Sequence, residues 1–182
     1  MNVVETALPD VRIIRPDVFG DTRGFFLETW NRRAFARAGL DADFVQDNHS
    51  RSARGTLRGL HYQVPRSQGK LIRVGRGKVF DVSVDLRRSS ATFGRWVGVT
   101  LSDETHELLW LPPGFAHGFL VLSEIADVHY KCTDYHAPED ERSIAWDDPD
   151  LAIEWPLPGG TPPLLSPRDR ASGRFRDADY LP

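Results

Sequence analysis

The chain has 182 residues, of which 40% are hydrophobic and 27% are charged, a composition typical of one globular domain. Its 23 Lys and Arg residues against 26 Asp and Glu residues give a formal net charge of −3, which argues against a nucleic-acid-binding scaffold. The sequence has no apolar run long enough to span a membrane and no recognisable signal peptide. Its single cysteine, Cys132, cannot form an internal disulfide, so we expect a cytoplasmic protein.

Short segments in which apolar and polar residues alternate follow one another along most of the chain, a pattern typical of β-strands. In chain order, we predict strands at residues 11–14 and 24–30, a helix at 32–38 that Asn31 caps and Gly39 ends, and strands at 70–74, 78–86, 96–101, 106–111, 118–122 and 126–131. The alternation is clearest in 78–86, where Asp81 and Asp85 lie on the inner face and are expected to form structural salt bridges.

About eight to ten short strands with turns between them indicate an all-β fold, and we predict a double-sheet jelly roll with one or two short helices. We treat residues 1–182 as one domain with three parts: N-terminal strands and a helix in 1–50, a jelly-roll core in 51–156 and a C-terminal tail in 157–182. The segment from Pro156 to Pro167 contains five prolines and two glycines, which predict a loop. The charged end of the chain is predicted to form a short helix or an ordered tail.

The spacing of the six histidines does not predict a metal site. They are His49, His61, His106, His117, His129 and His136. The chain has no HxH, HExxH or CxxC motif, no GxSxG motif and no glycine-rich phosphate loop, so we expect neither a metal ion nor a cofactor. A metal-dependent enzyme is disfavoured for the same reason. We expect His49 on a surface strand, with no role in the site.

The remaining residues suited to chemistry form an acid–base set. His61 can take and return a proton near neutral pH, Tyr130 can donate a proton to a carbanion, and Lys70 can stabilise an oxyanion. Together with a carboxylate that orients the imidazole, they suit proton abstraction next to a carbonyl group. Since most domains of this size contain a His, a Tyr and a Lys, this set alone does not distinguish an enzyme from a binding module.

The faces on which Arg58 and His61 lie depend on the regularity of the segment 57–63. Strict alternation places the two side chains on opposite faces, whereas a bulge at Gly59 brings them together. The alternative is a surface strand with scattered polar residues.

Several longer motifs resemble those of one family of nucleotide-sugar enzymes. They are DTRGFFLETW (21–30), FVQDNHSRS (44–52), LRGLHYQ (57–63), QGKLIRV (68–74), LPPGFAHGFLVLSE (111–124), YKCTDYHAPEDE (130–141), WDDPDLAIEWP (146–156) and LSPRD (165–169). They run in order along the chain with short gaps between them. On these motifs the chain resembles the cupin-like dTDP-4-dehydrorhamnose 3,5-epimerase family.

The resemblance implies a jelly roll that forms a homodimer by exchanging N-terminal strands. It implies epimerisation at C3 and C5 of dTDP-4-keto-6-deoxyglucose, on the route to dTDP-L-rhamnose, without a cofactor. His61 matches the family's general base, and Asp169 matches the carboxylate that pairs with it. Tyr130 matches the general acid on the opposite face of the sugar, and Lys70 the lysine near the C4 oxygen. The positions that contact substrate in the family are Arg23, Glu28, Gln46, Asp47, Asn48, Arg58, His117, His136, Glu141 and Arg168.

Two positions depart from the usual pattern of the family. Its members commonly have two adjacent aromatic residues where this chain has Tyr135 and His136, and the second stacks on the thymine ring. Arg168 stands where a lysine is often found, which keeps the charge but changes its geometry. The alternatives are a member of the family that inverts only C3 or only C5, and a sugar-nucleotide-binding cupin without activity. The joint presence of the four catalytic residues argues against the second.

Overall fold

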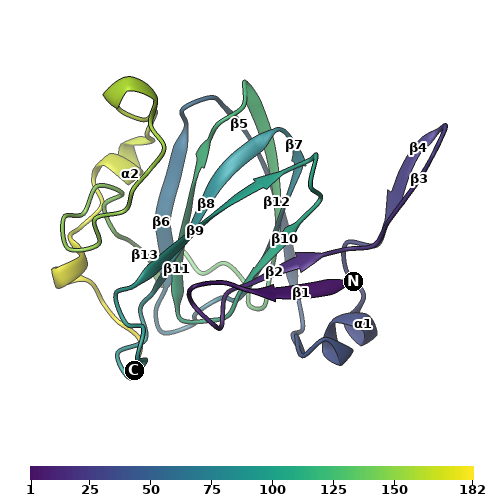
Figure 1. Ribbon diagram of the computed structural model, residues 1–182. Helices are drawn as coiled ribbons and strands as arrows, with labels where there is room; N and C mark the ends of the chain where they lie inside the picture. The colour runs from purple at the N-terminus through teal and green to yellow at the C-terminus, as the bar shows by residue number, and fades with distance from the viewer.

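The computed structural model of the protein consists of two β-sheets packed face to face (Figure 1). The structure describes residues 1–182, apart from the side chain of Pro158. The larger sheet has six strands in the order β1 (Asn2–Glu5), β2 (Arg12–Arg15), β10 (Leu108–Leu111), β7 (Lys70–Arg76), β12 (Ile125–Cys132) and β5 (Gln46–Ala53). The smaller sheet has five strands in the order β13 (Glu141–Ser143), β6 (Leu57–Gln63), β11 (Phe115–Val121), β8 (Lys78–Asp85) and β9 (Trp96–Ser102). The predicted all-β, double-sheet jelly roll is confirmed.

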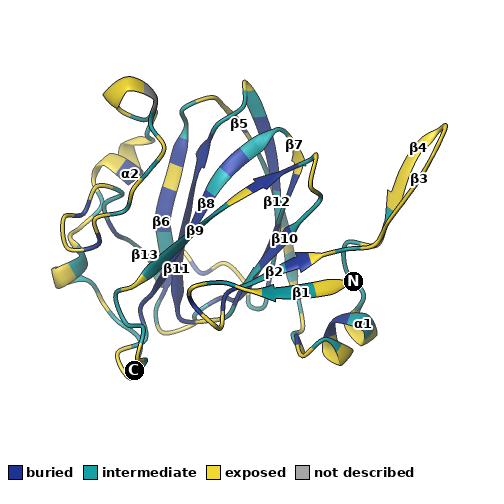
Figure 2. Cartoon of the chain, in the orientation of Figure 1, coloured by how far each residue is buried: buried dark blue, intermediate teal, exposed yellow. Residues whose placement is uncertain are grey.

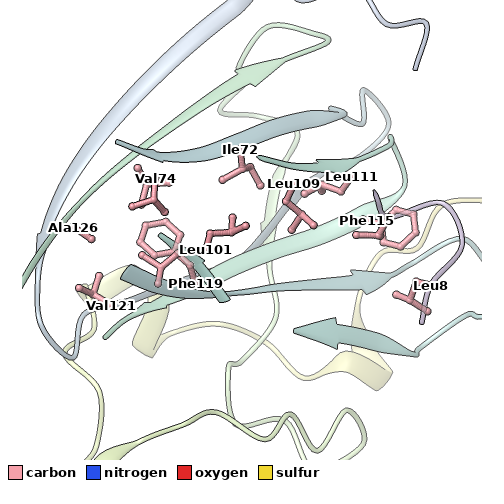
Figure 3. Close-up of a cluster of buried hydrophobic side chains, with 13 residues drawn as sticks. Leu8, Ile72, Val74, Leu101, Leu109, Leu111, Phe115, Phe119, Val121 and Ala126 are labelled. Carbon is pink, nitrogen blue, oxygen red and sulfur yellow. The ribbon is translucent and has the colours of Figure 1, made fainter. Parts of the chain in front are cut away.

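The central core fills part of the space between the two sheets (Figure 3). Ile72 and Leu109 come from the larger sheet, and Leu101 and Phe119 come from the smaller one, and all four are buried in this cluster. Apolar burial of this kind contributes about 25 cal/mol per Å² of area removed from water. The core therefore holds the two sheets in fixed positions, and the polar residues between them project from rigid strands.

A second core lies on the outer face of the smaller sheet. Val82 and Val84 of β8 belong to it, whereas their neighbour Val79 belongs to the central core, so β8 is covered on both sides. Trp155 and Phe175 of the C-terminal segment pack against this second core. The C-terminal segment therefore lies across the smaller sheet, beside β6.

The helices are short. In α1 (Arg32–Arg37), Oδ1 of Asn31 accepts a hydrogen bond of 3.1 Å from the N–H of Ala34, and Gly39 follows with φ of +79°, so the predicted cap and end are confirmed. The C-terminal segment carries η1 (Pro158–Gly160), α2 (Pro167–Arg170) and η2 (Phe175–Asp177). Among the described helices, none has both the length and the apolar character that a membrane crossing needs.

The prediction of a strand at residues 24–30 is wrong over its second half. The strand β4 is Gly24–Leu27, and it pairs only with β3 (Val18–Asp21), in a projecting hairpin that belongs to neither sheet (Figures 1 and 2). Because the hairpin is not hydrogen-bonded to a strand of either sheet, no further partner is available to extend β4 beyond residue 27.

The strands β1, β3, β5 and β13 were not predicted. In β5, the sequence QDNHSRSA has no apolar residue on either face except Ala53, so it lacks the alternation that marks the other strands. The division of the chain at residues 50 and 156 stays a prediction.

Candidate active site

A cavity of about 350 Å³ lies between the two sheets and has a largely polar lining. It receives side chains from β5, β7 and β12 on one wall and from β6 and β11 on the other. The predicted site residues that line it are Gln46, Asn48, Arg58, His61, Lys70, His117, Tyr130, His136 and Glu141. Segments far apart in the sequence therefore bring most of the predicted set to one place.

The register of the larger sheet explains why its polar residues share a face. Alternate residues of a strand point to the same side. Tyr130 of β12 is paired with Asn48 of β5, and Cys132 is paired with Gln46 of β5 and Lys70 of β7. These residues therefore stand in two adjacent rows on the inner face, and all of them line the cavity.

A bulge at Gly59 shapes the opposite wall. His61 is paired with His117, but Arg58 is paired with Phe119, so three steps along β6 match two steps along β11. Arg58 and His61 consequently lie on the same face, so of the alternatives that the sequence left open the structure shows the bulge. The bulge requires a glycine, because φ is +117° and a Cβ atom at this position would lie 2.6 Å from backbone atoms of β11.

Asp169 holds the ring of His61 from the C-terminal segment. Oδ1 of Asp169 lies 2.6 Å from Nε2 of His61 and also accepts a hydrogen bond of 3.3 Å from the N–H of Gly59. Oδ2 accepts a hydrogen bond of 2.6 Å from the hydroxyl of Ser166, which caps α2. The carboxylate is 4% exposed, and the side chain of His61 is 32% exposed.

The protonation of this pair follows from its hydrogen bonds. Burial favours the neutral form of Asp169, but the hydrogen bonds from His61 and Ser166 outweigh it and lower the pKa to about 2. An ionised carboxylate only accepts hydrogen bonds, so Nε2 of His61 carries the proton that points to Asp169. Nδ1 is then the ring nitrogen that can take a proton from another molecule.

Tyr130 and Lys70 stand on the wall opposite His61. Burial raises the pKa of Tyr130, helped by Cys132 and opposed by Arg58, so its hydroxyl stays protonated near neutral pH. Burial lowers the pKa of Lys70, whose Nζ donates a hydrogen bond of 3.3 Å to Oε1 of Gln68. A histidine on one wall of the cavity thus faces a phenol hydroxyl and an amine on the other.

A second histidine–carboxylate pair lies beside the first. Nε2 of His117 lies 3.0 and 2.9 Å from the two oxygens of Asp81, and both residues are buried. Burial raises the pKa of Asp81, and His117 opposes this effect. Asp85, further along β8, forms an ion pair of 2.8 Å with Arg87. The expected salt bridge is confirmed for Asp85, and Asp81 is hydrogen-bonded to His117 at the cavity wall.

At the edge of the cavity, Glu141 binds two basic side chains. Its Oε2 lies 2.9 Å from Nε2 of His136 and 2.6 Å from Nη1 of Arg168. Burial favours the neutral acid, but the hydrogen bonds from His136 and Arg168 outweigh it and lower the pKa of Glu141. The N–H of His136 also donates to Oε1 of Gln46 at 2.8 Å, which fixes this loop against β5.

Three predicted substrate contacts lie away from the cavity of their own chain. Arg23 is paired with Asp21 in the exposed hairpin, and Glu28 accepts a hydrogen bond of 3.0 Å from Asn31. Asp47 lies on the outer face of β5, where its Oδ2 accepts a hydrogen bond of 2.8 Å from Lys131. Since neighbouring residues of a strand point to opposite sides, Asp47 cannot share the face of Gln46 and Asn48.

Sequence analysis did not assign several residues to this site. They are Ser50, Tyr62, Gln63, Gln68, Phe119 and Cys132. Gln63 and Gln68 are polar residues at the ends of the matched motifs LRGLHYQ and QGKLIRV, and that position was the available signal; both are buried. Gln63 has a structural role, because its Oε1 accepts a hydrogen bond of 3.0 Å from the N–H of Ala137. Cys132 is buried. The described residues contain no group of three or more His, Cys, Asp or Glu side chains arranged to hold a metal ion.

Comparison with known proteins identifies the family. The model of the dTDP-4-dehydrorhamnose 3,5-epimerase family matches residues 5–177. The chain belongs to this family. It is 58% identical over 183 residues to the dTDP-4-dehydrorhamnose 3,5-epimerase of Pseudomonas aeruginosa, and the match covers all of both chains.

Solved structures of epimerases have the same fold. The dTDP-6-deoxy-D-glucose-3,5-epimerase of Legionella pneumophila, in complex with dTDP-4-keto-L-rhamnose, matches with a TM-score of 0.94 and 51% identity, over 98% of this chain and 94% of that chain. A 3'-monoepimerase of Streptomyces bikiniensis, in complex with dTDP-quinovose, matches with a TM-score of 0.85 and 35% identity, over 93% of this chain and 86% of that chain. The resemblance found in the sequence is confirmed, and the protein is an isomerase of the nucleotide-sugar epimerase class.

Proposed function

We propose that the protein converts dTDP-4-dehydro-6-deoxy-D-glucose into dTDP-4-dehydro-L-rhamnose by inverting C3 and C5, in the biosynthesis of dTDP-L-rhamnose. The observation that carries this proposal is the arrangement of His61 and Tyr130 on opposite walls of one cavity. Inversion of a carbon needs a proton to leave one face and another to arrive at the opposite face. A base and an acid on the same wall would instead return the proton to the face that it left.

The first step is removal of a proton next to the ketone. The C4 carbonyl acidifies the hydrogens on C3 and C5, and Nδ1 of His61 takes one of them. The electron pair of the broken C–H bond moves to form an enolate, with its negative charge on the C4 oxygen. A positioned base contributes about 10²–10⁴-fold to such a step. The ionised Asp169 stabilises the imidazolium that forms, 2.6 Å away.

The second step returns a proton to the other face of the ring. The protonated hydroxyl of Tyr130 donates to the carbon, and the electron pair of the enolate forms the new C–H bond. Lys70, on the same wall as Tyr130, is the group that stabilises the oxyanion while it exists. Afterwards His61 releases its proton to solvent and Tyr130 regains one, so the enzyme returns to its starting state.

Arginine side chains suit the diphosphate of the substrate, because a guanidinium binds two phosphate oxygens at once. Arg58 lines the cavity and uses Nε for a hydrogen bond of 3.0 Å to Ser52, so its two Nη groups are the remaining donors. Arg168 reaches the edge of the cavity at Glu141. We assign both to the diphosphate.

We also propose that the active protein is a homodimer in which the β3–β4 hairpin completes the site of the second copy. Phe19, Phe25 and Phe26 of this hairpin are 65%, 62% and 70% exposed, and such an apolar strip is typical of a surface that a protein partner covers. The predicted substrate contacts Arg23 and Glu28 lie on and just after this hairpin, outside their own cavity.

A nucleotide-sugar substrate and one free, buried cysteine are consistent with a cytoplasmic enzyme.

Incubation with dTDP-4-keto-6-deoxyglucose in D₂O, followed by NMR of the sugar, tests the proposed function. We expect deuterium at both C3 and C5, together with the L-rhamno configuration. Exchange and inversion at one carbon only would make the protein a mono-epimerase, like its relative from Streptomyces bikiniensis. Binding without exchange at either carbon would contradict the proposal and favour a sugar-nucleotide-binding protein without catalytic activity.

A further inference from the structure

The loop that precedes β13 carries a histidine that the proposed mechanism does not use. His136 lines the cavity, and its side chain is 48% exposed. Its Nε2 and Nη1 of Arg168 contact the same oxygen of Glu141, at 2.9 and 2.6 Å. One carboxylate oxygen therefore serves two basic groups. Arginine is always cationic, whereas histidine is the residue type whose charge changes between pH 5 and 8.

The charge on the cluster of His136, Glu141 and Arg168 is influenced by the polar and charged groups around it. Those that face Glu141 and His136 are Arg168 on α2, His61 on β6 with its partner Asp169, Lys70 on β7, Tyr130 on β12 and Gln46 on β5. Of these, His61 is the other histidine, so its contribution has to be separated from that of His136 when binding is compared at two pH values.

The charge of the cluster depends on His136. When the imidazole is neutral, the single negative charge of Glu141 balances the single positive charge of Arg168. When the imidazole is protonated, Glu141 is shared between two cations, and the cluster carries one net positive charge. An anion that reaches the edge of the cavity is attracted more strongly in the second state.

We propose that His136 and Glu141 set how strongly Arg168 attracts the diphosphate of the bound nucleotide sugar, so that protonation of His136 tightens nucleotide binding. The inference rests on the proposed function, because it takes this cavity as the nucleotide-sugar site. It makes His136 a residue that determines affinity, and Glu141 the carboxylate whose charge offsets that of Arg168. One added unit charge a few ångströms from a phosphate near the protein surface strengthens binding about tenfold.

Binding of dTDP-glucose at pH 6 and pH 8 tests the inference without relying on turnover. This sugar nucleotide has no C4 ketone to react, and its diphosphate, esterified at both ends, does not titrate in this range. Titration calorimetry at constant ionic strength should give a dissociation constant about tenfold lower at pH 6 than at pH 8. His136→Phe should remove most of this difference between the two pH values; the readout is the ratio of the two dissociation constants, because a phenyl ring at this position can also change the affinity itself.

A matched control is His49→Phe. His49 is 50% exposed on the outer face of β5 and contacts Asp127 at 3.3 Å, so this variant removes an exposed, carboxylate-paired histidine outside the cavity. It should keep the full difference between the two pH values. His61→Asn should also keep most of the difference, which separates the effect of His136 from that of the base.

Glu141→Gln gives an independent test. Removing the carboxylate charge frees Arg168 from its neutralising partner, so the variant should bind dTDP-glucose several-fold more tightly than the wild type at pH 8. Weaker binding by Glu141→Gln, or an unchanged pH difference in His136→Phe, would overturn the inference. If the wild type binds dTDP-glucose equally well at both pH values, only this inference fails. If the wild type does not bind it at either pH, the proposed site fails as well.

Discussion

His61 and His117 are paired neighbours on the adjacent strands β6 and β11, and both contact a carboxylate through Nε2. The carboxylates differ. Asp169 receives hydrogen bonds from a histidine, a serine hydroxyl and a backbone N–H, and its pKa falls to about 2. Asp81 has His117 as its partner and is fully buried, so burial raises its pKa.

This difference supports the proposed role of His61 as the base and a structural role for the His117–Asp81 pair. A firmly ionised carboxylate fixes one tautomer of the imidazole and stabilises the imidazolium cation. A carboxyl group whose neutral form is favoured by burial is a weaker hydrogen-bond acceptor and stabilises the cation less. The His61 side chain is also 32% exposed, while that of His117 is 8% exposed. Proximity of a histidine to a carboxylate therefore does not identify the base; the hydrogen bonds to the carboxylate do.

Replacing each histidine in turn should give the largest contrast. His61→Ala should lower kcat by about 10³–10⁴-fold and abolish deuterium exchange at both C3 and C5, because no other group on that wall takes the proton. His117→Ala should lower kcat/KM by about tenfold, mainly through KM, since His117 lines the cavity without serving as the base. Steady-state kinetics and NMR in D₂O measure both effects. Equal losses in kcat would remove the distinction between the two pairs.

Tyr130→Phe extends the comparison to the opposite wall. Abstraction by His61 can still occur, but the proton donor on the other face is gone, so inversion should slow by about 10²-fold while exchange slows less. The ratio of exchanged to inverted sugar, followed by NMR over time, reports this directly. If epimerisation proceeds at the wild-type rate, Tyr130 is not the acid.

Gly59→Ala tests what places His61 in the cavity. The added Cβ would lie 2.6 Å from the backbone of β11, so we expect a loss of about 2–4 kcal/mol in the free energy of unfolding, together with reduced kcat. Gly55→Ala is the matched control. Gly55 also has a positive φ, +77°, but a Cβ there meets nothing within 4 Å, so its loss should stay near 1 kcal/mol with kcat unchanged. Urea unfolding and initial rates compare the two.

The smallest expected effect is the pH dependence that Asp169 gives to stability. Because folding lowers its pKa from 3.8 to about 2, Asp169 stabilises the folded protein by about 2 kcal/mol above pH 5. This contribution should be lost as the pH falls from about 4 to 2. Asp81, whose pKa is raised, has the opposite effect on the free energy of unfolding: it lowers the stability of the folded protein as the pH rises. Urea unfolding of the wild type and Asp169→Asn from pH 7 to pH 3 should show the two converging, and parallel curves would contradict the assignment.

The sequence predicted those parts of the structure that depend on local pattern. Alternation located β8, the Asn31 cap located α1, and the glycine between Arg58 and His61 indicated the bulge that brings them together. It did not predict β5, because the inner face of that strand borders a polar cavity and has no apolar period.

Contacts between segments far apart in the chain could not be predicted from the sequence. Nothing in the spacing of His136, Glu141 and Arg168 indicates that they meet at one oxygen, since α2 reaches the cavity only after the tail crosses the smaller sheet. Motif resemblance placed Arg23 and Glu28 at a substrate site, yet the fold of one chain leaves them in and beside a detached hairpin.

The polar inner face of β5 has a consequence for how such enzymes diverge. Gln46, Asn48 and Ser50 line the cavity and belong to none of the apolar clusters that hold the sheets together. Replacing one of them reshapes the sugar site without opening a void in the core, where the loss of a large side chain costs about 2–5 kcal/mol. This strand is therefore where the lining of the cavity can change, by evolution or in the laboratory, with little loss of folding stability.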